Sequence, residues 1–305
     1  MNKSVKAFQT YQQQLQLLSS RGMEIDFPDA ALEKLTNINY YRLSGYWYPF
    51  REQIANASTH RLDNFYPGTT FEDVIHLYDF DERLRSAVFA CLTPIELSLR
   101  ALLGHYLGEV HECAHMKPDS LFLKDPNTSK SYQKWISDYN KALSSSKEDF
   151  VLHHQDKYGG NLPIWAAVEI LDWGKLSYLF GFSPLKVQQN VADSFGLTAP
   201  QLHSWMKSLN ILRNICAHHG RLFNRGLSMK PRLPRDPAIL GIPKPDEAMN
   251  RAFGQLTLIQ YLLHKRNIGD SDLLPTVLDS FPSVRIVPIS HIGAPDDWRT
   301  FELWK

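Results

Sequence analysis

Three things are scarce in this sequence, and each scarcity narrows the class of protein. Only three cysteines occur in 305 residues, and the odd count indicates free, buried thiols in a reducing compartment rather than a disulfide framework. No uninterrupted run of about 18 apolar residues occurs, so no membrane span is expected. The N-terminus shows no secretory signal pattern, which makes the cytoplasm the expected location.

The net charge is also small. With 33 Lys and Arg against 32 Asp and Glu, the chain carries a formal charge of +1. A strongly basic composition would indicate a nucleic-acid partner, and it is not found here. Any contact with RNA must therefore come from a local basic patch. No glycine-rich nucleotide loop and no Cys-x-x-Cys pair occurs, and we expect no cofactor.

Hydrophobic residues are plentiful, at 43%, and recur mainly at helical spacing, which predicts an all-α fold. The longest helical pattern covers residues 71–110, and Pro94 inside it is expected to kink or break the helix. The aromatic stretch 38–50 favours a helix over a strand. A last helix is expected at about 247–266, and a strand or extended segment near 284–289.

One predicted helix, at about 198–219, carries the most chemistry. Thr198 and Gln201 form a capping box at its start, and Gly220 ends it. Its apolar stripe consists of Leu202, Trp205, Leu209, Leu212 and Cys216. The helical wheel places His219 on the same stripe, as a core histidine.

The opposite face of this helix is polar in an unusual way. Arg213 and His218 flank a stripe that contains Asn214 and the small Ala217. Arg, Asn and His around a small residue suit a phosphate pocket better than a merely solvated face. The bare spacing of Arg and His is not specific, because Arg100/His105 and Arg285/His291 share it, and we interpret the latter pair as chance.

The sequence RNICAHHGRLFN, residues 213–224, resembles the R-N-x-x-x-H motif of HEPN ribonucleases. Four successive blocks also resemble the Abi-like abortive-infection family (AbiD/AbiF type). They are NYYRLSGYWYPF, then LYDFDERLR with IELSLR, then LPIWAAVEILDWGKLSYLF, then CAHHGRLFNR. The resemblance covers most of residues 35–225. It implies a HEPN-like helical bundle at 70–225, a helical extension at 1–69, and a proline-rich linker with a helical extension at 226–305.

The resemblance further implies metal-independent endoribonuclease activity in phage defence, with Arg213, Asn214 and His218 as catalytic residues. A histidine can move protons at neutral pH, and Arg213 would stabilise charge on the phosphorus. The supporting or RNA-binding candidates are Glu96, Arg100, His219, Arg221 and Asn224. We expect Glu96 and Arg100 to form a buried or pocket-lining pair beside the Arg213 helix, with a structural salt bridge equally compatible.

Partners follow from the same hypothesis. RNA is the expected substrate, and toxicity would call for restraint by a small RNA or a protein antitoxin. One motif supplies one clear acid–base histidine, whereas the reaction needs two proton transfers. A homodimer would supply the second histidine, or His219 or His105 would do so within one chain.

Two alternatives stay open. The first is an RNA-binding protein of the same type that has lost cleavage. The second is a zinc hydrolase, because His111-Glu112-x-x-His115 matches a zinc-protease motif. Gly108 and Pro118 flank this motif, so a helix end with solvated histidines is the favoured interpretation.

Overall fold

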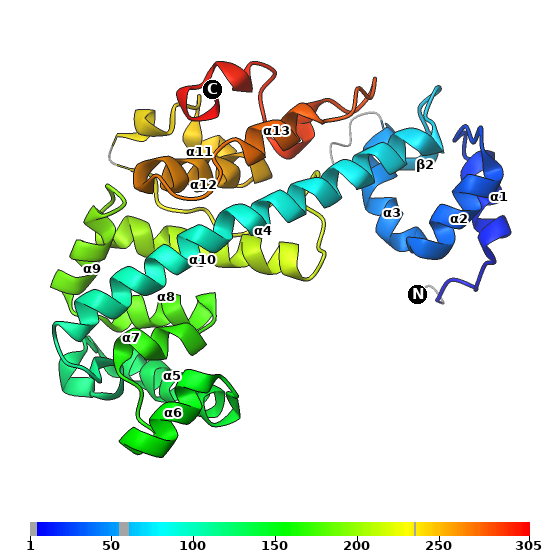
Figure 1. Ribbon diagram of the computed structural model, residues 1–305. Coiled ribbons are helices and arrows are strands. Elements are labelled where there is room, and N and C mark those ends of the chain that lie inside the picture. The colour runs from blue at the N-terminus through cyan, green and yellow to red at the C-terminus, as the bar shows by residue number, and fades with distance from the viewer. Residues whose placement is uncertain (1–4, 55–60, 235) are drawn as a thin grey trace.

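The computed structural model describes residues 5–54, 61–234 and 236–305, and it confirms the all-α prediction. Helices surround one long central helix, α4 (Phe71–Gly108), which runs diagonally through the molecule in Figure 1. The remaining α-helices are α1 (Tyr11–Ser20), α2 (Pro28–Asn37), α3 (Tyr40–Trp47), α5 (Pro126–Ser145), α6 (Asp149–Tyr158), α7 (Ile164–Ala167), α8 (Trp173–Phe182), α9 (Leu185–Asp193), α10 (Ala199–Ala217), α11 (Pro245–Ala248), α12 (Ala252–Arg266) and α13 (Leu273–Asp279).

The N-terminal end carries a small hairpin that the sequence did not suggest. Strands β1 (Arg51–Gln53) and β2 (Arg61–Phe65) pair antiparallel, with Arg51 opposite Phe65. The residues of this segment are mostly polar and do not alternate with apolar ones, which explains why no strand pattern was visible. The aromatic stretch before it is helical, as predicted, in α3 and the short 3-10 turn Tyr48–Phe50.

Of the two outcomes predicted for Pro94, a kink or a break, the break does not occur, and helix α4 continues through this residue. Proline removes the hydrogen bond to the carbonyl four residues earlier, that of Ala90. Ala90 is exposed, so water can satisfy this carbonyl. The ring of Pro94 is also packed closely, because a Cβ added at Gly269 would lie 2.8 Å from it. The helix is therefore continuous over about 57 Å, with Pro94 packed against the segment at Gly269.

By length and composition alone, α4 is long and apolar enough to cross a membrane. It contacts α7, α9, α10 and α13, and 44% of its most apolar window is buried within the protein. Its buried face also carries an ion pair between Asp81 and Arg85. These features are those of a core helix in a bundle.

The C-terminal part differs from expectation in two places. The predicted helix at 247–266 is divided into α11 and α12, since residues 249–251 leave the helical path. The segment 284–289 forms no strand: residues 285 and 286 make a turn, Pro288 is extended, and Ile289 begins a 3-10 helix. Helix α10 begins as predicted, with the Gln201 side chain accepting a hydrogen bond from the Thr198 amide at 2.9 Å.

A histidine is buried in the core beside α5. His115 has no exposed surface, its ring meets Tyr139 edge-on at 5.0 Å, and neither ring nitrogen has a hydrogen-bond partner among the described residues. Burial lowers the pKa of His115 to about 4. The imidazole is therefore neutral in the folded protein at neutral pH.

This burial predicts a pH dependence of stability. Because the folded-state pKa lies below the ordinary 6.5, the unfolded chain binds more protons between about pH 6.5 and 4, and stability falls as the pH is lowered through that window. His115→Phe should remove up to about 3 kcal/mol of that loss. Urea unfolding at several pH values measures it. His76→Phe, at an exposed histidine of α4, is the control, and identical pH profiles for both variants would contradict the assignment.

Candidate functional site

The Arg–Asn–His motif lies at the C-terminal end of α10. The buried apolar stripe of this helix packs against α4, α8 and α9 and fixes its orientation. Trp205 adds a hydrogen bond of 2.8 Å from its indole nitrogen to the carbonyl of Arg232. The motif residues thus stand on a rigid element, with Arg213 half-buried and Asn214 and His218 exposed.

Arg213 holds its guanidinium against α4 without an ion pair among the described residues. The guanidinium carbon lies 5.3 Å from the centre of the Phe89 ring, and Phe89 is itself 40% exposed. The Nε atom is buried and has no hydrogen-bond partner among the described residues. The buried Nε is out of reach of a ligand, but the terminal amino groups form no hydrogen bond or ion pair among the described residues. Those amino groups are therefore available to an anionic group.

The charge of Arg213 acts on the carboxylate of Asp172. Asp172, the N-cap of α8, forms an ion pair with Lys175. Burial raises the pKa of Asp172, but hydrogen bonds from Lys175 and the charges of Lys175 and Arg213 lower it overall. Asp172 thus remains ionised close to Arg213, but its charge is balanced by Lys175.

After Ala217 the chain makes a tight turn that exposes two histidines. The Gly220 amide bonds to the Ile215 carbonyl at 2.7 Å, and the His219 amide bonds to the Cys216 carbonyl at 3.0 Å. This is the Schellman pattern, in which the residue at the position of His219 is usually glycine. His219 adopts φ of 55°, a left-handed conformation that costs a non-glycine residue roughly 1–2 kcal/mol.

The prediction that His219 is a core histidine is therefore wrong. The helical wheel assumed that the helix continues to residue 219, whereas α10 ends at Ala217 and His218 is already its C-cap. Beyond that point the chain turns away, and both imidazoles lie on the surface. His219 consequently becomes a better candidate for proton transfer than the sequence suggested.

A buried carboxylate fixes the chain that follows this turn. Asp81 of α4 has no exposed surface and accepts hydrogen bonds from the amides of Leu222, at 3.1 Å, and Phe223, at 2.7 Å. The Tyr46 hydroxyl donates to the same carboxylate at 2.6 Å, and Arg85 completes an ion pair with it. Burial raises the pKa of Asp81, while Tyr46, Arg85 and the two amides act in the opposite direction.

Two arginines add further ties between α3 and the turn. Arg42 donates to the carbonyl of His219 at 2.5 Å, and Arg221 donates to the carbonyl of Gly45. A Cβ at Gly45 would lie only 3.0–3.2 Å from the Arg221 side chain, so only glycine allows this approach without displacement. Arg221 is half-buried and engaged with α3, and its contact with a phosphate stays a prediction.

Two further candidates, Asn224 and the Glu96–Arg100 pair, occupy positions that the fold itself explains. Asn224 is half-buried with φ of 48°, as suits a turn residue. Arg100 binds Glu96 at 2.5 Å and the Leu171 carbonyl at 2.8 Å, and both side chains are largely buried. Phe89 marks the point on α4 that Arg213 contacts. Glu96 lies seven residues further along, about 10 Å away along the helix axis. The pair thus fixes the segment before α8 rather than joining Arg213 directly.

His105 lies too far along α4 to serve the motif within one chain. It is 66% exposed and pairs with Glu109. Sixteen residues separate it from Phe89, which contacts Arg213, and this corresponds to about 24 Å of helix.

A zinc-protease motif needs both histidines on one face of one helix, and these residues form no such helix. Helix α4 ends at Gly108, so His111 and Glu112 lie in a turn and His115 lies in a short 3-10 segment. His115 points into the core, whereas His111 is near Lys117 at the surface. In the described ranges no group of three or more His, Cys, Asp or Glu side chains is placed to hold a metal ion.

Comparison with protein families decides the relationship. The family model described as Abi-like protein matches residues 33–224, which is more than half of the chain. The chain belongs to the Abi-like family. No curated protein and no solved structure matches it in the corresponding searches. Family membership supports a role in abortive infection, a form of phage defence.

The part of the chain that matches the Abi-like family contains every residue of the anchoring network: Arg42, Gly45, Tyr46, Asp81, Arg85 and Arg221. Sequence reasoning missed Asp81 as a functional residue. The signal available was an acidic and a basic residue four apart within an apolar helical pattern, which points to an ion pair on a buried face. Nothing local indicates that the partner amides lie 141 and 142 residues away.

Removing the carboxylate of Asp81 should destabilise this Abi-like protein strongly. Asp81→Ala leaves Arg85 and two backbone amides buried without their acceptor, so the free energy of unfolding should fall by about 3–5 kcal/mol. Chemical denaturation measures the change. Glu82→Ala, one residue along and exposed, should shift it by less than about 0.5 kcal/mol. Equal effects of the two substitutions would refute the anchoring role.

Proposed function

We propose that this Abi-like protein is a metal-independent endoribonuclease of the HEPN type, with Arg213, Asn214 and His218 as catalytic residues. One observation carries the proposal. The turn after α10 is held by hydrogen bonds to buried or half-buried groups, yet it exposes His218 and His219 to solvent and keeps His219 in a strained conformation. Strain that the surrounding structure enforces on an exposed turn is typical of functional sites.

The residues suit cleavage by internal attack. The ribose 2′-oxygen bonds to the adjacent phosphorus, the bond from phosphorus to the 5′-oxygen breaks, and a 2′,3′-cyclic phosphate and a 5′-hydroxyl result. His218 takes the 2′ proton or gives a proton to the leaving oxygen. Arg213, whose guanidinium forms no ion pair among the described residues, binds the phosphate oxygens through its terminal amino groups as negative charge develops. Asn214 orients His218 or binds a phosphate oxygen.

A second proton-transfer group is needed, and the exposed His219 beside His218 can supply it. A homodimer that brings two copies of the turn together would supply it from the second copy instead. As an effector of phage defence, such a nuclease would need restraint by a small RNA or a protein antitoxin. The intended targets would be host or phage RNA.

The test is cleavage of single-stranded RNA with a chelator present. Wild type should cleave, and His218→Ala and Arg213→Ala should lose at least about 100-fold in rate, since each removes a group that acts in the transition state. His153→Ala, an exposed histidine on α6, is the matched control and should leave the rate unchanged.

Binding of the same RNA, measured alongside, separates the rival explanations. Retained binding with lost cleavage in His218→Ala supports the enzyme. Binding without cleavage by wild type would instead identify an RNA-binding protein. Cleavage that the chelator abolishes would contradict the metal-independent mechanism.

A further inference from the structure

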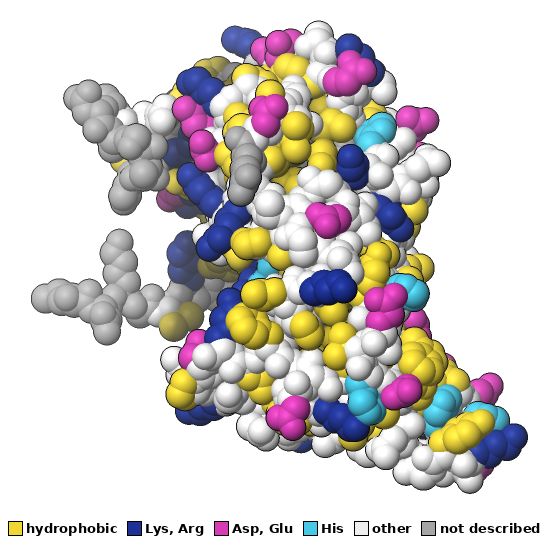
Figure 2. Space-filling view, turned by 90° about the vertical axis from the view of Figure 1, so that its left-hand side faces the viewer, with side chains coloured by type: hydrophobic (Ala, Val, Ile, Leu, Met, Phe, Trp, Pro, Cys, Tyr) yellow, Lys and Arg dark blue, Asp and Glu magenta, His cyan; other side chains and the backbone are white. Residues whose placement is uncertain are grey.

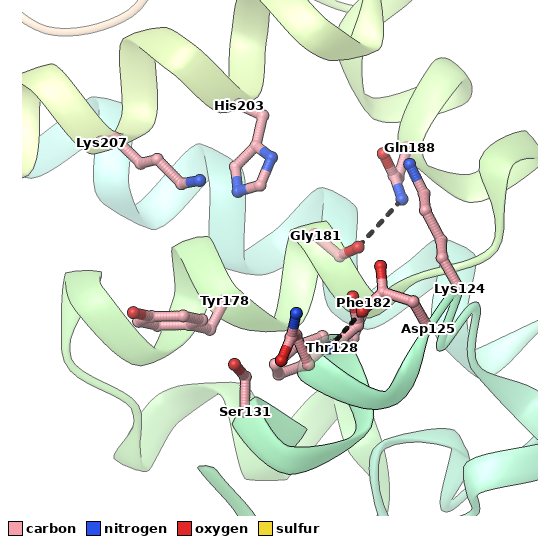
Figure 3. A pocket seen from close by; sticks show the side chains of 11 residues that line it. Lys124, Asp125, Thr128, Ser131, Tyr178, Gly181, Phe182, Gln188, His203 and Lys207 are labelled. Carbon is pink, nitrogen blue, oxygen red and sulfur yellow. Dashed lines mark hydrogen bonds between the residues drawn. The ribbon is translucent and has the colours of Figure 1, made fainter. Parts of the chain in front are cut away.

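A second polar region lies near the start of α10, away from the motif. His203 and Lys207 of α10 face α8, α9 and the segment before α5 across a cavity of about 350 Å³. Figure 3 shows both side chains directed into this space from one helix, with Tyr178 of α8 opposite them. A neighbouring depression of about 440 Å³ shares Lys124, His203 and Lys207, and it extends the region to Arg232.

The region is rich in unpaired positive charge. Lys124, Lys207 and Arg232 are exposed, and none of them forms an ion pair within the described residues. Asp125 also lines the cavity, but its carboxylate caps α5 by accepting from the Thr128 amide at 2.9 Å. Figure 2 views the end of the molecule that is on the left in Figure 1, where Lys and Arg side chains along one edge are interspersed with hydrophobic and acidic ones.

The pKa of His203 is lowered in part by these cations. Burial is the largest cause that lowers it, and the charges of Lys207, Lys124 and Arg232 lower it further, to about 4. The imidazole is therefore neutral at neutral pH and adds no charge of its own. The lining of the two depressions also places all three cations beside this one half-buried ring.

The floor of the cavity is rigid. The imidazole of His203 rests on Gly181, where an added Cβ would lie 2.7 Å from the ring. Gln188 donates to the Gly181 carbonyl at 3.3 Å and to the Ser183 carbonyl at 2.7 Å. Beside this floor the Tyr178 ring is 56% exposed. Cations that follow a phosphate backbone, next to an exposed aromatic ring, are the components of a site for single-stranded nucleic acid.

Helix geometry connects the cavity to the motif. His203, Lys207, Asn210 and Asn214 are spaced i, i+4, i+7 and i+11, so they share one face of α10. The rise from His203 to Asn214 is about 16 Å, a span of a few nucleotides. Asp172 is near this path, and its charge is offset by Lys175.

We propose that the cavity is a subsite for the RNA strand that flanks the scissile bond. Lys124, Lys207 and Arg232 bind backbone phosphates and Tyr178 stacks on a base. This inference rests on the proposed ribonuclease function for the position of the scissile bond. The strand then follows the face of α10 from the turn at His218 to the cavity.

The experiment measures RNA affinity in full-length protein that carries His218→Ala, so that binding does not depend on cleavage. The probes are a single-stranded oligoribonucleotide long enough to span α10, a dinucleotide, and a free mononucleotide. In the double variant Lys124→Ala/Lys207→Ala the affinity for the long RNA should fall at least about tenfold, and the slope of log K against log salt should decrease by about 0.7 for each lost phosphate contact. Tyr178→Ala should weaken long-RNA binding by about tenfold through lost stacking.

Binding of the dinucleotide should be the same in all of these proteins, because it does not reach the cavity. Lys157→Ala, an exposed lysine on α6, is the control and should change nothing. Unchanged long-RNA affinity in the double variant would overturn the subsite, even if the wild type cleaves RNA. A mononucleotide that binds as tightly as the long RNA, with equal sensitivity to the lysine substitutions, would also overturn it and would identify a site for a free nucleotide. Absence of cleavage by the wild type, with these binding results intact, would overturn the ribonuclease and leave the cavity as an RNA-binding site.

Discussion

The contact between the Asp81 carboxylate and the chain after α10 is the interaction on which the rest of the site depends. A carboxylate without solvent is costly, and here four donors compensate it: two backbone amides, the Tyr46 hydroxyl and the Arg85 guanidinium. Because Asp81 belongs to the central helix, it joins the turn to the element around which the bundle packs. Arg42 and Arg221 then join the same turn to α3.

This arrangement separates two tasks within a short stretch of chain. The backbone of residues 219–223 is used for anchoring, through its amides and the His219 carbonyl. The side chains of His218 and His219 are left exposed. A rigid backbone with exposed imidazoles is what proton transfer requires, since a catalytic group must be positioned before the substrate arrives. Helix α10 performs a similar double task, because its apolar stripe packs in the core while its polar face connects the motif to the basic cavity.

Much of the fold follows from the sequence, because helical periodicity is a local property. The capping box of α10 and the long pattern of α4 are visible residue by residue, and both helices form. What could not be foreseen depends on distant contacts. Pro94 packs against the segment at Gly269 within a continuous α4, and the end of α10 at Ala217 moves His219 from the core to the surface. The role of Asp81 was hidden for the same reason, since its partner amides lie on the far side of the sequence.

The candidate residues Arg213, Asn214 and His218 came from a motif and a family resemblance, and the structure adds the reason why they are positioned as they are. The chemistry of the RNA ends tests this account most directly. Wild-type protein incubated with a defined RNA and a chelator should leave a 2′,3′-cyclic phosphate on one product and a 5′-hydroxyl on the other, as required by attack of the ribose 2′-oxygen. Products with a 3′-hydroxyl and a 5′-phosphate would contradict it, because they require an attacking water instead.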